Sequence, residues 1–341
     1  MSRRAALIGL AIVIVVLAVM PWVAPLLGLD ISIISEVLLD ALAAMGVNLL
    51  LGYTGLPAFG MAAFFGLGAY GAALSVQDLG VGFVTAVAIG TAAALVGGLL
   101  IGPFLVRRRG IYFGLLFIAF GQVFYFVAYR FNQFTGGEDG MTVVRPALGI
   151  PGHALTLKAD SMYGLVLGVF VVVLVLFWIL VESPFGQTLV AIRQNETRVR
   201  YLGLNSDRFV FVALLIASAM AGLGGALYAL LINFSYPLLL DWHLSGDFVL
   251  MSVLGGAGTV FGPIIGALIY VCSKDLVSNV TQAWQIIVGG IFVVCVLGFP
   301  RGILGTALHL YNRRIEPGPE IALEAPYETS TGAGLVGEPH G

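Results

Sequence analysis

Long apolar runs occupy most of this 341-residue chain and restrict it to a membrane fold. The runs lie near residues 5–28, 31–51, 56–75, 81–106, 111–130, 161–181, 208–232, 245–258, 260–279 and 283–299. One α-helix needs about 20 apolar residues to cross a bilayer. Because the runs are continuous and do not alternate with polar residues, a transmembrane β-barrel is excluded. We therefore expect an all-α, polytopic transmembrane helical bundle of about eight to ten spans with Gly-broken helices.

The composition supports a membrane protein and excludes several other classes. Hydrophobic residues make up 59% of the chain and charged residues 10%, against about 45–50% and about 25% in soluble domains. The net charge of −2 gives no indication of a nucleic-acid partner. Cys272 and Cys295 lie in apolar runs, so we expect small buried side chains and predict neither a disulfide nor a metal site.

The distribution of Lys and Arg predicts the orientation of the chain in the membrane. With ten crossings and a cytoplasmic N-terminus, 12 of the 16 Lys and Arg residues fall on the cytoplasmic side. Both termini are then cytoplasmic, and residues 131–160 form the one long outer loop. Residues 1–314 make up the membrane domain, and the acidic stretch 315–341, which has no Lys or Arg, is predicted to be a disordered tail.

Glycine and proline interrupt the apolar runs at residues 48–60 and 254–263. Both interruptions contain Leu-Gly-x-x-Gly followed by Phe-Gly, which indicates a faint internal repeat. Paired interruptions in the two halves of a transporter indicate a translocation pathway, because irregular backbone at membrane depth is tolerated only inside protein or beside water. The alternative is an ordinary tight turn at the membrane surface. The candidate pathway residues are Asn48, Gly52, Tyr53, Thr54, Gly55, Gly255, Gly256, Gly258 and Thr259.

A charged segment at residues 183–205 separates two apolar runs. Pro184 suits the first turn of a helix and Gly203 suits its end, so we predict an amphipathic helix over 184–202 at the cytoplasmic surface. Such a helix could bind lipid headgroups alone. Asn195 and Glu196, however, interrupt the basic face that anionic lipid prefers, which favours a protein partner. The candidate residues for contact with this partner are Arg193, Asn195, Glu196, Arg198 and Gly203. Helical spacing predicts that Arg193 and Arg198 lie near Glu196.

These segments together resemble the motifs of branched-chain amino acid ABC transporter permeases. The similar stretches are residues 46–55 with 62–70, 135–141, 183–205 and 255–263. The outer-loop stretch 135–141 makes the chain similar to the longer of the two paired permeases. The resemblance implies a prokaryotic inner (plasma) membrane, import by alternating access, and contact between 184–202 and an ATPase. It also implies three kinds of partner: a second permease subunit, two cytoplasmic ATP-binding subunits and an extracytoplasmic solute-binding protein.

The resemblance implies a non-catalytic transport subunit without a cofactor. The sequence contains no G-x-x-x-x-G-K-[ST] phosphate loop, so ATP hydrolysis is assigned to a partner. An intramembrane enzyme is not indicated either, since H-E-x-x-H and G-x-S-x-G motifs are absent. His243 stands next to Trp242 and is expected to be an interfacial anchor.

Two alternatives stay open at this point. The resemblance extends to importers of urea and short amides, so a branched-chain amino acid is one of several substrate classes. A self-sufficient secondary transporter or channel would need charged residues within the membrane, for which Glu36, Asp40 and the pair Lys274–Asp275 are the candidates. The structural alternative places Glu36 at the outer interface and has Asp40 hydrogen-bonded to a neighbouring helix.

Overall fold

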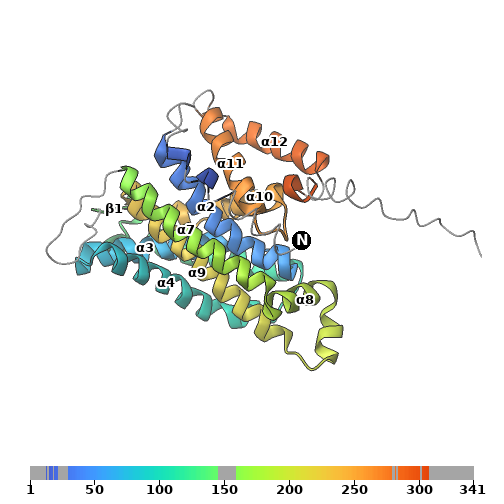
Figure 1. Cartoon of the computed structure of the whole chain (residues 1–341). Helices are drawn as coiled ribbons and strands as arrows, with labels where there is room; N and C mark the ends of the chain where they lie inside the picture. Colours follow the sequence, from blue (N-terminus) through green and yellow to red (C-terminus); the bar gives the residue numbers. More distant parts are fainter. Residues whose placement is uncertain are drawn as a thin grey trace, which may run out of the picture. The chain divides into compact units, whose positions relative to one another are not determined.

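The computed structural model describes residues 13, 15–17, 19–21, 30–144, 159–278, 281, 283–299 and 302–306. Three sequence predictions fall wholly or partly outside these residues: the tail at 315–341, most of the first apolar run, and positions 145–158 of the outer loop. The elements within the described residues are helices and helical turns together with two short strands (Figure 1).

Helices and helical turns make up most of the described residues. They are α2 (Ile31–Asn48), η2 (Leu49–Thr54), α3 (Met61–Leu79), α4 (Phe83–Leu105), α5 (Ile111–Arg130), α6 (Asn132–Thr135), η3 (Gly137–Asp139), α7 (Ala159–Glu182), α8 (Pro184–Tyr201), α9 (Ser206–Ile232), η4 (Pro237–Leu240), α10 (Trp242–Gly255), α11 (Gly262–Ser278) and α12 (Trp284–Gly298). The strands are β1 (Met141–Thr142) and β2 (Phe234–Ser235), which pair antiparallel.

Five stretches of the described residues are long and apolar enough to cross a membrane. They are α2 with η2, α4, α5, residues 161–182 of α7, and α9. The all-α membrane class predicted from the sequence is therefore confirmed, and the count of eight to ten spans stays a prediction. The run at 245–258, which is short for a span, corresponds to the 14-residue helix α10.

The helix α2 forms the centre of the bundle. Its apolar window is 89% buried, against 22% for that of α7, because α2 packs against α7, α9, α10 and α11 (Figure 1). Cys272 on α11 and Cys295 on α12 have free thiols and are half-buried, where the sequence analysis expected buried side chains. For Cys295 the reason is that α12 packs against fewer of the described helices than α2 does.

Small residues bring α3, α4 and α9 into close contact beside α2. A Cβ atom at Gly68 of α3 would run into the backbone of Gly222 of α9, and one at Gly90 of α4 would run into the carbonyl of Gly68. Small residues allow this approach of helix backbones in a bilayer. The three helices therefore form a closely packed group, which meets α2 mainly through α9.

The described part of the predicted outer loop is ordered by backbone pairing. After α5, the chain forms α6 and η3, and Met141 of β1 then pairs with Ser235 of β2. Because β2 follows α9 directly, this pairing ties the C-terminal end of α5 to the C-terminal end of α9.

Candidate functional site

The charged segment after α7 folds as α8, but its helical geometry is broken at Asn195. The backbone there has φ −160° and ψ 95°, and the Asn195 Oδ1 atom accepts a hydrogen bond of 3.0 Å from the Arg198 amide. This is the geometry of a helix N-cap. The segment therefore consists of two short helices, from Pro184 to Gln194 and from Glu196 to Tyr201.

The predicted bounds of 184–202 agree with α8 to within a residue, but the prediction of one continuous helix is wrong. Asn competes with the helix backbone for hydrogen bonds and is favoured at N-caps over helix interiors. The signal was present in the sequence, since Asn195 is followed by an acidic residue in the first turn, as at many helix starts.

Gly203 ends the second of these helices, as predicted. It has φ 84°, and its amide donates to the Arg200 carbonyl while the Leu204 amide donates to the Val199 carbonyl. These two bonds form a Schellman motif, which requires the left-handed conformation that glycine adopts without strain.

The two interruptions predicted from separate parts of the sequence are in direct contact. The Asn48 Nδ2 atom, at the end of α2, donates to the Thr259 carbonyl at 2.7 Å. The Gly258 amide donates to the Asn48 Oδ1 atom, also at 2.7 Å. One fully buried amide side chain thus joins the end of α2 to the connection between α10 and α11.

Gly52 lies at the point of closest approach between the interruptions. It belongs to η2, a π-helical turn that continues α2. A Cβ atom at Gly52 would collide with the Asn48 Oδ1 atom and with the Gly258 amide nitrogen. Only glycine leaves the space that this backbone contact needs.

Arg193 of α8 connects the charged segment to both interruptions. Its Nη1 atom donates a hydrogen bond to the Gly52 carbonyl and lies 3.5 Å from the position that a Cβ atom would take on Gly258. Its Cγ atom lies 3.0 Å from the corresponding position on Gly55. Carbonyls in the last turn of a helix have no partner within the helix, and a cation stabilises that end. Arg193 is therefore a side-chain cap on the end of α2.

The first interruption is recessed into the bundle on one side. A Cβ atom at Gly60 would collide with Phe117, which lies six residues, about 9 Å, along α5 from its start at Ile111. Asn48 and Gly52 are buried as well, whereas Gly55 is exposed. The turn is therefore open on one side and packed inside the bundle on the other.

Tyr53 and Thr54 do not face the second interruption. The Tyr53 ring packs edge-on against Phe177 of α7, with 6.2 Å between ring centroids. The Thr54 hydroxyl donates to the Leu50 carbonyl of its own helix at 2.5 Å. Of these two candidate pathway residues, Tyr53 therefore packs η2 against α7, and Thr54 stabilises the turn of η2 itself.

Gly255 and Gly256 close the turn between α10 and α11. A Cβ atom at Gly255 would collide with the carbonyl of Gly262, at the start of α11. Gly256 has φ 124°, and Gly302 packs against its Cα atom. Both glycines allow close backbone packing, but neither contacts Arg193 in the described residues.

Four charged side chains form an ion-pair cluster beside α8. The Arg109 Nη2 atom, from the loop before α5, lies 2.8 Å from Glu196 Oε1 and 2.5 Å from Asp207 Oδ1. The Arg200 Nη2 atom lies 2.9 Å from the same Glu196 oxygen and 3.3 Å from Asp207. The cluster therefore fastens α8 to the α4–α5 loop and to the first turn of α9.

The electrostatics of the ion-pair cluster stabilise an ionised Glu196. Partial burial by itself raises the pKa of this carboxyl, but hydrogen bonds and charge from Arg109, together with Arg200, outweigh burial and lower the pKa below its usual value. The sequence predicted Arg193 and Arg198 as the neighbours of Glu196, and this prediction is wrong. Arg193 instead donates to Gly52, and Arg198 is exposed. The break at Asn195 is the cause, because it removes the helical spacing on which that expectation depended.

Comparison with known proteins shows the family of the chain. The family described as "Branched-chain amino acid transport system / permease component" matches residues 30–297, which include both interruptions and α8. The chain belongs to this permease family. The resemblance predicted from the sequence motifs is therefore confirmed, and the permease is a multi-pass inner-membrane protein of a transport family.

Curated relatives agree with the family. The permease is 29% identical to the high-affinity branched-chain amino acid transport system permease protein LivM of Escherichia coli K12, over 76% of this chain and 66% of the relative. It is 27% identical to LivM of Salmonella typhimurium, over 81% of this chain and 70% of the relative. The autoinducer 2 import system permease protein LsrC of E. coli O157:H7 is 30% identical over 49% of the permease and 51% of its own length. No solved structure matches the permease significantly.

An exposed apolar tip, which was not predicted from the sequence, lies next to the ion-pair cluster. Tyr201, Leu202 and Leu204 follow one another at the end of α8, and Tyr201 and Leu202 are 87% and 75% exposed. We call these three residues the apolar tip. Large apolar side chains at the end of a charged segment were the available signal, because exposed apolar groups indicate an interaction surface.

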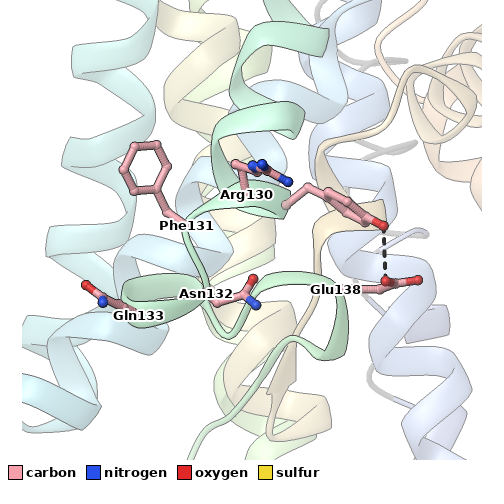
Figure 2. A pocket seen from close by; sticks show the side chains of 6 residues that line it. Arg130, Phe131, Asn132, Gln133 and Glu138 are labelled. Atoms are coloured by element: carbon pink, nitrogen blue, oxygen red, sulfur yellow. Dashed lines mark hydrogen bonds between the residues drawn. The ribbon is translucent and has the colours of Figure 1, made fainter.

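A hollow of about 560 Å³ lies at the other end of the permease. Arg109 precedes α5 and the hollow follows α5, so about 30 Å of helix separates it from the ion-pair cluster. Figure 2 shows Glu138 hydrogen-bonded within this hollow, where it accepts from the Tyr129 hydroxyl at 3.0 Å. The hollow is lined by Tyr129, Arg130, Phe131, Asn132, Gln133 and Glu138.

Proposed function

We propose that the permease is the membrane-spanning subunit of an ATP-driven ABC importer that moves a branched-chain amino acid or a related small polar solute by alternating access. Its partners are a second permease subunit, two cytoplasmic ATP-binding subunits and an extracytoplasmic solute-binding protein. ATP hydrolysis belongs to the ATP-binding subunits, and the permease itself uses no cofactor. The named function of the LivM relatives supports the substrate class.

The observation that carries this proposal is the hydrogen bond from Arg193 to Gly52, at the point where the two interruptions meet. In the proposed topology α8 is cytoplasmic, so an ATP-binding subunit that moves α8 also moves the guanidinium bound to the Gly52 carbonyl. Gly52 in turn touches Gly258 of the second interruption. The movement of one side chain is thus passed to the two broken helices that form the proposed pathway, with Asn48 and Thr259 next to it.

The apolar tip and the exposed positions of α8 form the proposed docking surface for an ATP-binding subunit. Asn195 shapes this surface by breaking the helix, and Gly203 shapes it by ending the helix. Glu196 holds the surface on the permease through the ion-pair cluster. Arg198 is exposed at the rim, where it can meet an acidic partner residue.

A variant of Arg193 tests the proposal in the complete importer reconstituted in proteoliposomes. Arg193→Ala is expected to lower uptake about 10-fold or more while ATP hydrolysis continues, because a charged hydrogen bond contributes about 1.5–3 kcal/mol. Arg193→Lys keeps the charge and should retain part of the uptake. Arg208→Ala is the matched control, since Arg208 is an exposed arginine on the same side. Full uptake by Arg193→Ala would contradict the proposed coupling.

The same proteoliposomes distinguish the proposed importer from two alternatives, a different substrate class and a secondary transporter or channel. Uptake of urea or a short amide, with no competition by leucine, would change the substrate class and leave the importer mechanism intact. Uptake that continues without the ATP-binding subunits would indicate a secondary transporter or channel and would overturn the proposal.

A further inference from the structure

The outer halves of α2, α10 and α11 bring four charged side chains together inside the bundle. The Lys274 Nζ atom on α11 lies 3.7 Å from the Glu36 Oε1 atom on α2. The carboxylates of Asp40 on α2 and Asp247 on α10 also act on the Lys274 ammonium group, and Tyr270 of α11 is hydrogen-bonded to Asp247. We call Glu36, Asp40, Asp247 and Lys274 the outer charged cluster.

The outer charged cluster is open at one end and closed at the other. Glu36 and Lys274 have side chains that are 24% and 40% exposed, whereas Asp40 is only 6% exposed. Asp40 follows Glu36 by four residues, so it lies about 6 Å further along α2. The Glu36–Lys274 pair therefore forms the accessible rim, and Asp40 forms the buried floor.

Asp40 accepts no hydrogen bond from the part of the chain that the structure describes. The charges of Glu36, Lys274 and Asp247 act on it, but the described residues place no donor on its carboxylate. A buried carboxyl group without a donor is costly to ionise, and an ionisable residue inside a membrane segment is by default a functional one. The carboxylate is thus in place for a donor that comes from outside the chain.

The balance of charge indicates what that donor is. Three carboxyl groups act on one ammonium group in the cluster, so a second cationic group bound there would be stabilised by carboxyl groups that Lys274 alone does not neutralise. Lys274 provides the opposite charge at the rim, where it suits a carboxylate. A ligand that carries an ammonium and a carboxylate a few ångströms apart matches the charge at both ends, whereas neutral urea or an amide carries neither charge.

The outer charged cluster lies on the contact between α2 and the hairpin of α10 and α11, which we call the seam. The seam leads to Gly52. Glu36, Asp40 and Asn48 follow one another on α2 at spacings of four and eight residues, which places them along one winding stripe of the helix. Asn48 contacts the α10–α11 connection, and Glu36 contacts α11. The stripe therefore faces the α10–α11 hairpin from its outer end to the first interruption (Figure 1).

We infer that the outer charged cluster is a binding site for a zwitterionic α-amino acid. Asp40 and Asp247 face its ammonium group, and Lys274 faces its carboxylate. This inference rests on the proposed function and deepens it, because it selects amino acids over urea and short amides. It concerns the permease itself and not the solute-binding protein.

Thermal unfolding of the full-length permease in nanodiscs tests the inference without any partner. A ligand that binds the folded state raises the unfolding temperature with its concentration. The probes are L-leucine, 4-methylpentanoate, which lacks the ammonium group, 3-methylbutylamine, which lacks the carboxylate, and sodium chloride. L-leucine is expected to raise the unfolding temperature more than either analogue at equal concentration.

Two variants and a control locate the effect. Asp40→Asn and Lys274→Gln are expected to weaken the leucine-dependent shift about 10-fold or more in concentration, as for loss of a charged hydrogen bond. Asp78→Asn is the control, since Asp78 is exposed near the end of α3, and it should leave the shift unchanged. If a variant does not fold, the double exchange Glu36→Lys with Lys274→Glu keeps the ion pair and is used in its place, with the leucine shift again expected to fall.

Each other outcome overturns the inference. An equal shift with 3-methylbutylamine would mean a site for cations only, and a shift with sodium chloride alone would mean a metal-cation site. No shift with leucine, or an unchanged shift in both variants, would mean a structural ion-pair network. ATP-dependent leucine uptake by the complete importer is measured in parallel. Uptake without a leucine shift in the isolated permease would contradict the binding site but not the proposed function. A leucine shift without ATP-dependent uptake would contradict the importer proposal but not the binding site.

Discussion

The two ends of the seam between α2 and the α10–α11 hairpin are held together by opposite means. At the Gly52 end, backbone groups meet at the distance that only glycine allows, and the Asn48 side chain satisfies the groups on both sides. At the Asp40 end, charged side chains from three helices meet, and the deepest carboxylate lacks a donor in the described residues. The same three helices are thus fixed by shape at one end and by charge at the other.

The two ends are therefore expected to tolerate different substitutions. A close backbone contact is sensitive to volume, because an added methyl group has nowhere to go. A cluster of buried charges is sensitive to the sign of charge but adds little to stability, because desolvation offsets the attraction. The Gly52 end is therefore expected to determine whether the permease folds, and the Asp40 end to determine what it binds.

The largest expected effect is that of Gly52→Val. The new side chain meets Asn48 and the Gly258 amide, so we expect a loss of about 3 kcal/mol or more, the upper range for overpacking. The measurement is thermal unfolding of the purified permease together with its yield. Gly168→Val on α7 is the matched control, because a Cβ atom there meets nothing within 4 Å. Equal stability of the two variants would remove the contrast between the two ends.

Asn48→Leu tests the side chain that joins the interruptions. It leaves the Gly258 amide and the Thr259 carbonyl without their partner, and unpaired buried polar groups cost about 1–3 kcal/mol each. We expect a fall in stability of about 2–3 kcal/mol in denaturant or heat. Ser75→Ala serves as control, since that hydroxyl bonds only the Ala72 carbonyl of its own helix and should change stability little.

The ion-pair cluster adds a smaller, pH-dependent contribution at the Gly52 end. Because the pKa of Glu196 is lowered in the folded permease, its contribution is fully present above the ordinary value of 4.5 and is lost as the pH falls below it. The partly exposed cluster is expected to contribute about 1 kcal/mol or less. Hydrogen exchange of α8 from neutral pH downwards measures this contribution. In Glu196→Gln, α8 should exchange faster at neutral pH, with a flatter dependence on pH; an unaltered profile would show that the cluster does not hold α8.

Asp40→Leu should have the smallest effect on stability and the most selective effect on binding. Asp40 has no hydrogen-bond donor in the described residues and is repelled by Glu36 and Asp247, so an apolar side chain of similar size removes the cost of burying this carboxyl group. The unfolding temperature without ligand should therefore stay the same or rise. The leucine-dependent shift should disappear. A large loss of stability in Asp40→Leu would show that the charged side chains stabilise the Asp40 end, contrary to our expectation that they contribute mainly to binding.

The sequence was sufficient for the parts of this arrangement that follow from local chemistry. Apolar runs predict the all-α membrane class, glycine and proline mark the two interruptions, and Gly203 marks the end of α8. Glu36, Asp40 and Lys274 stand out as charges in apolar runs because such residues are rare there. Each of these signals lies within a few positions of the feature it predicts.

The pairings between distant segments could not be predicted in this way. Arg193 and Gly52 are 141 residues apart, and Arg109 and Asp207 are 98 residues apart, so no spacing in the sequence connects them. The Lys and Arg count places Arg109 and α8 on one side of the membrane, but it does not choose among the arginines there. That choice depends on the break at Asn195, which sets the direction of every side chain after it.

The cap that Arg193 places on α2 has a thermodynamic consequence. If the bond between Arg193 and the Gly52 carbonyl is weaker in one state of the importer than in another, then α8 and the Gly52 turn exchange free energy through it. Such coupling is reciprocal: a partner that binds α8 in one state changes the affinity of the turn for its ligand by some factor, and that ligand changes the affinity of α8 for the partner by the same factor. The cap would therefore carry information in both directions, from nucleotide to solute and from solute to nucleotide.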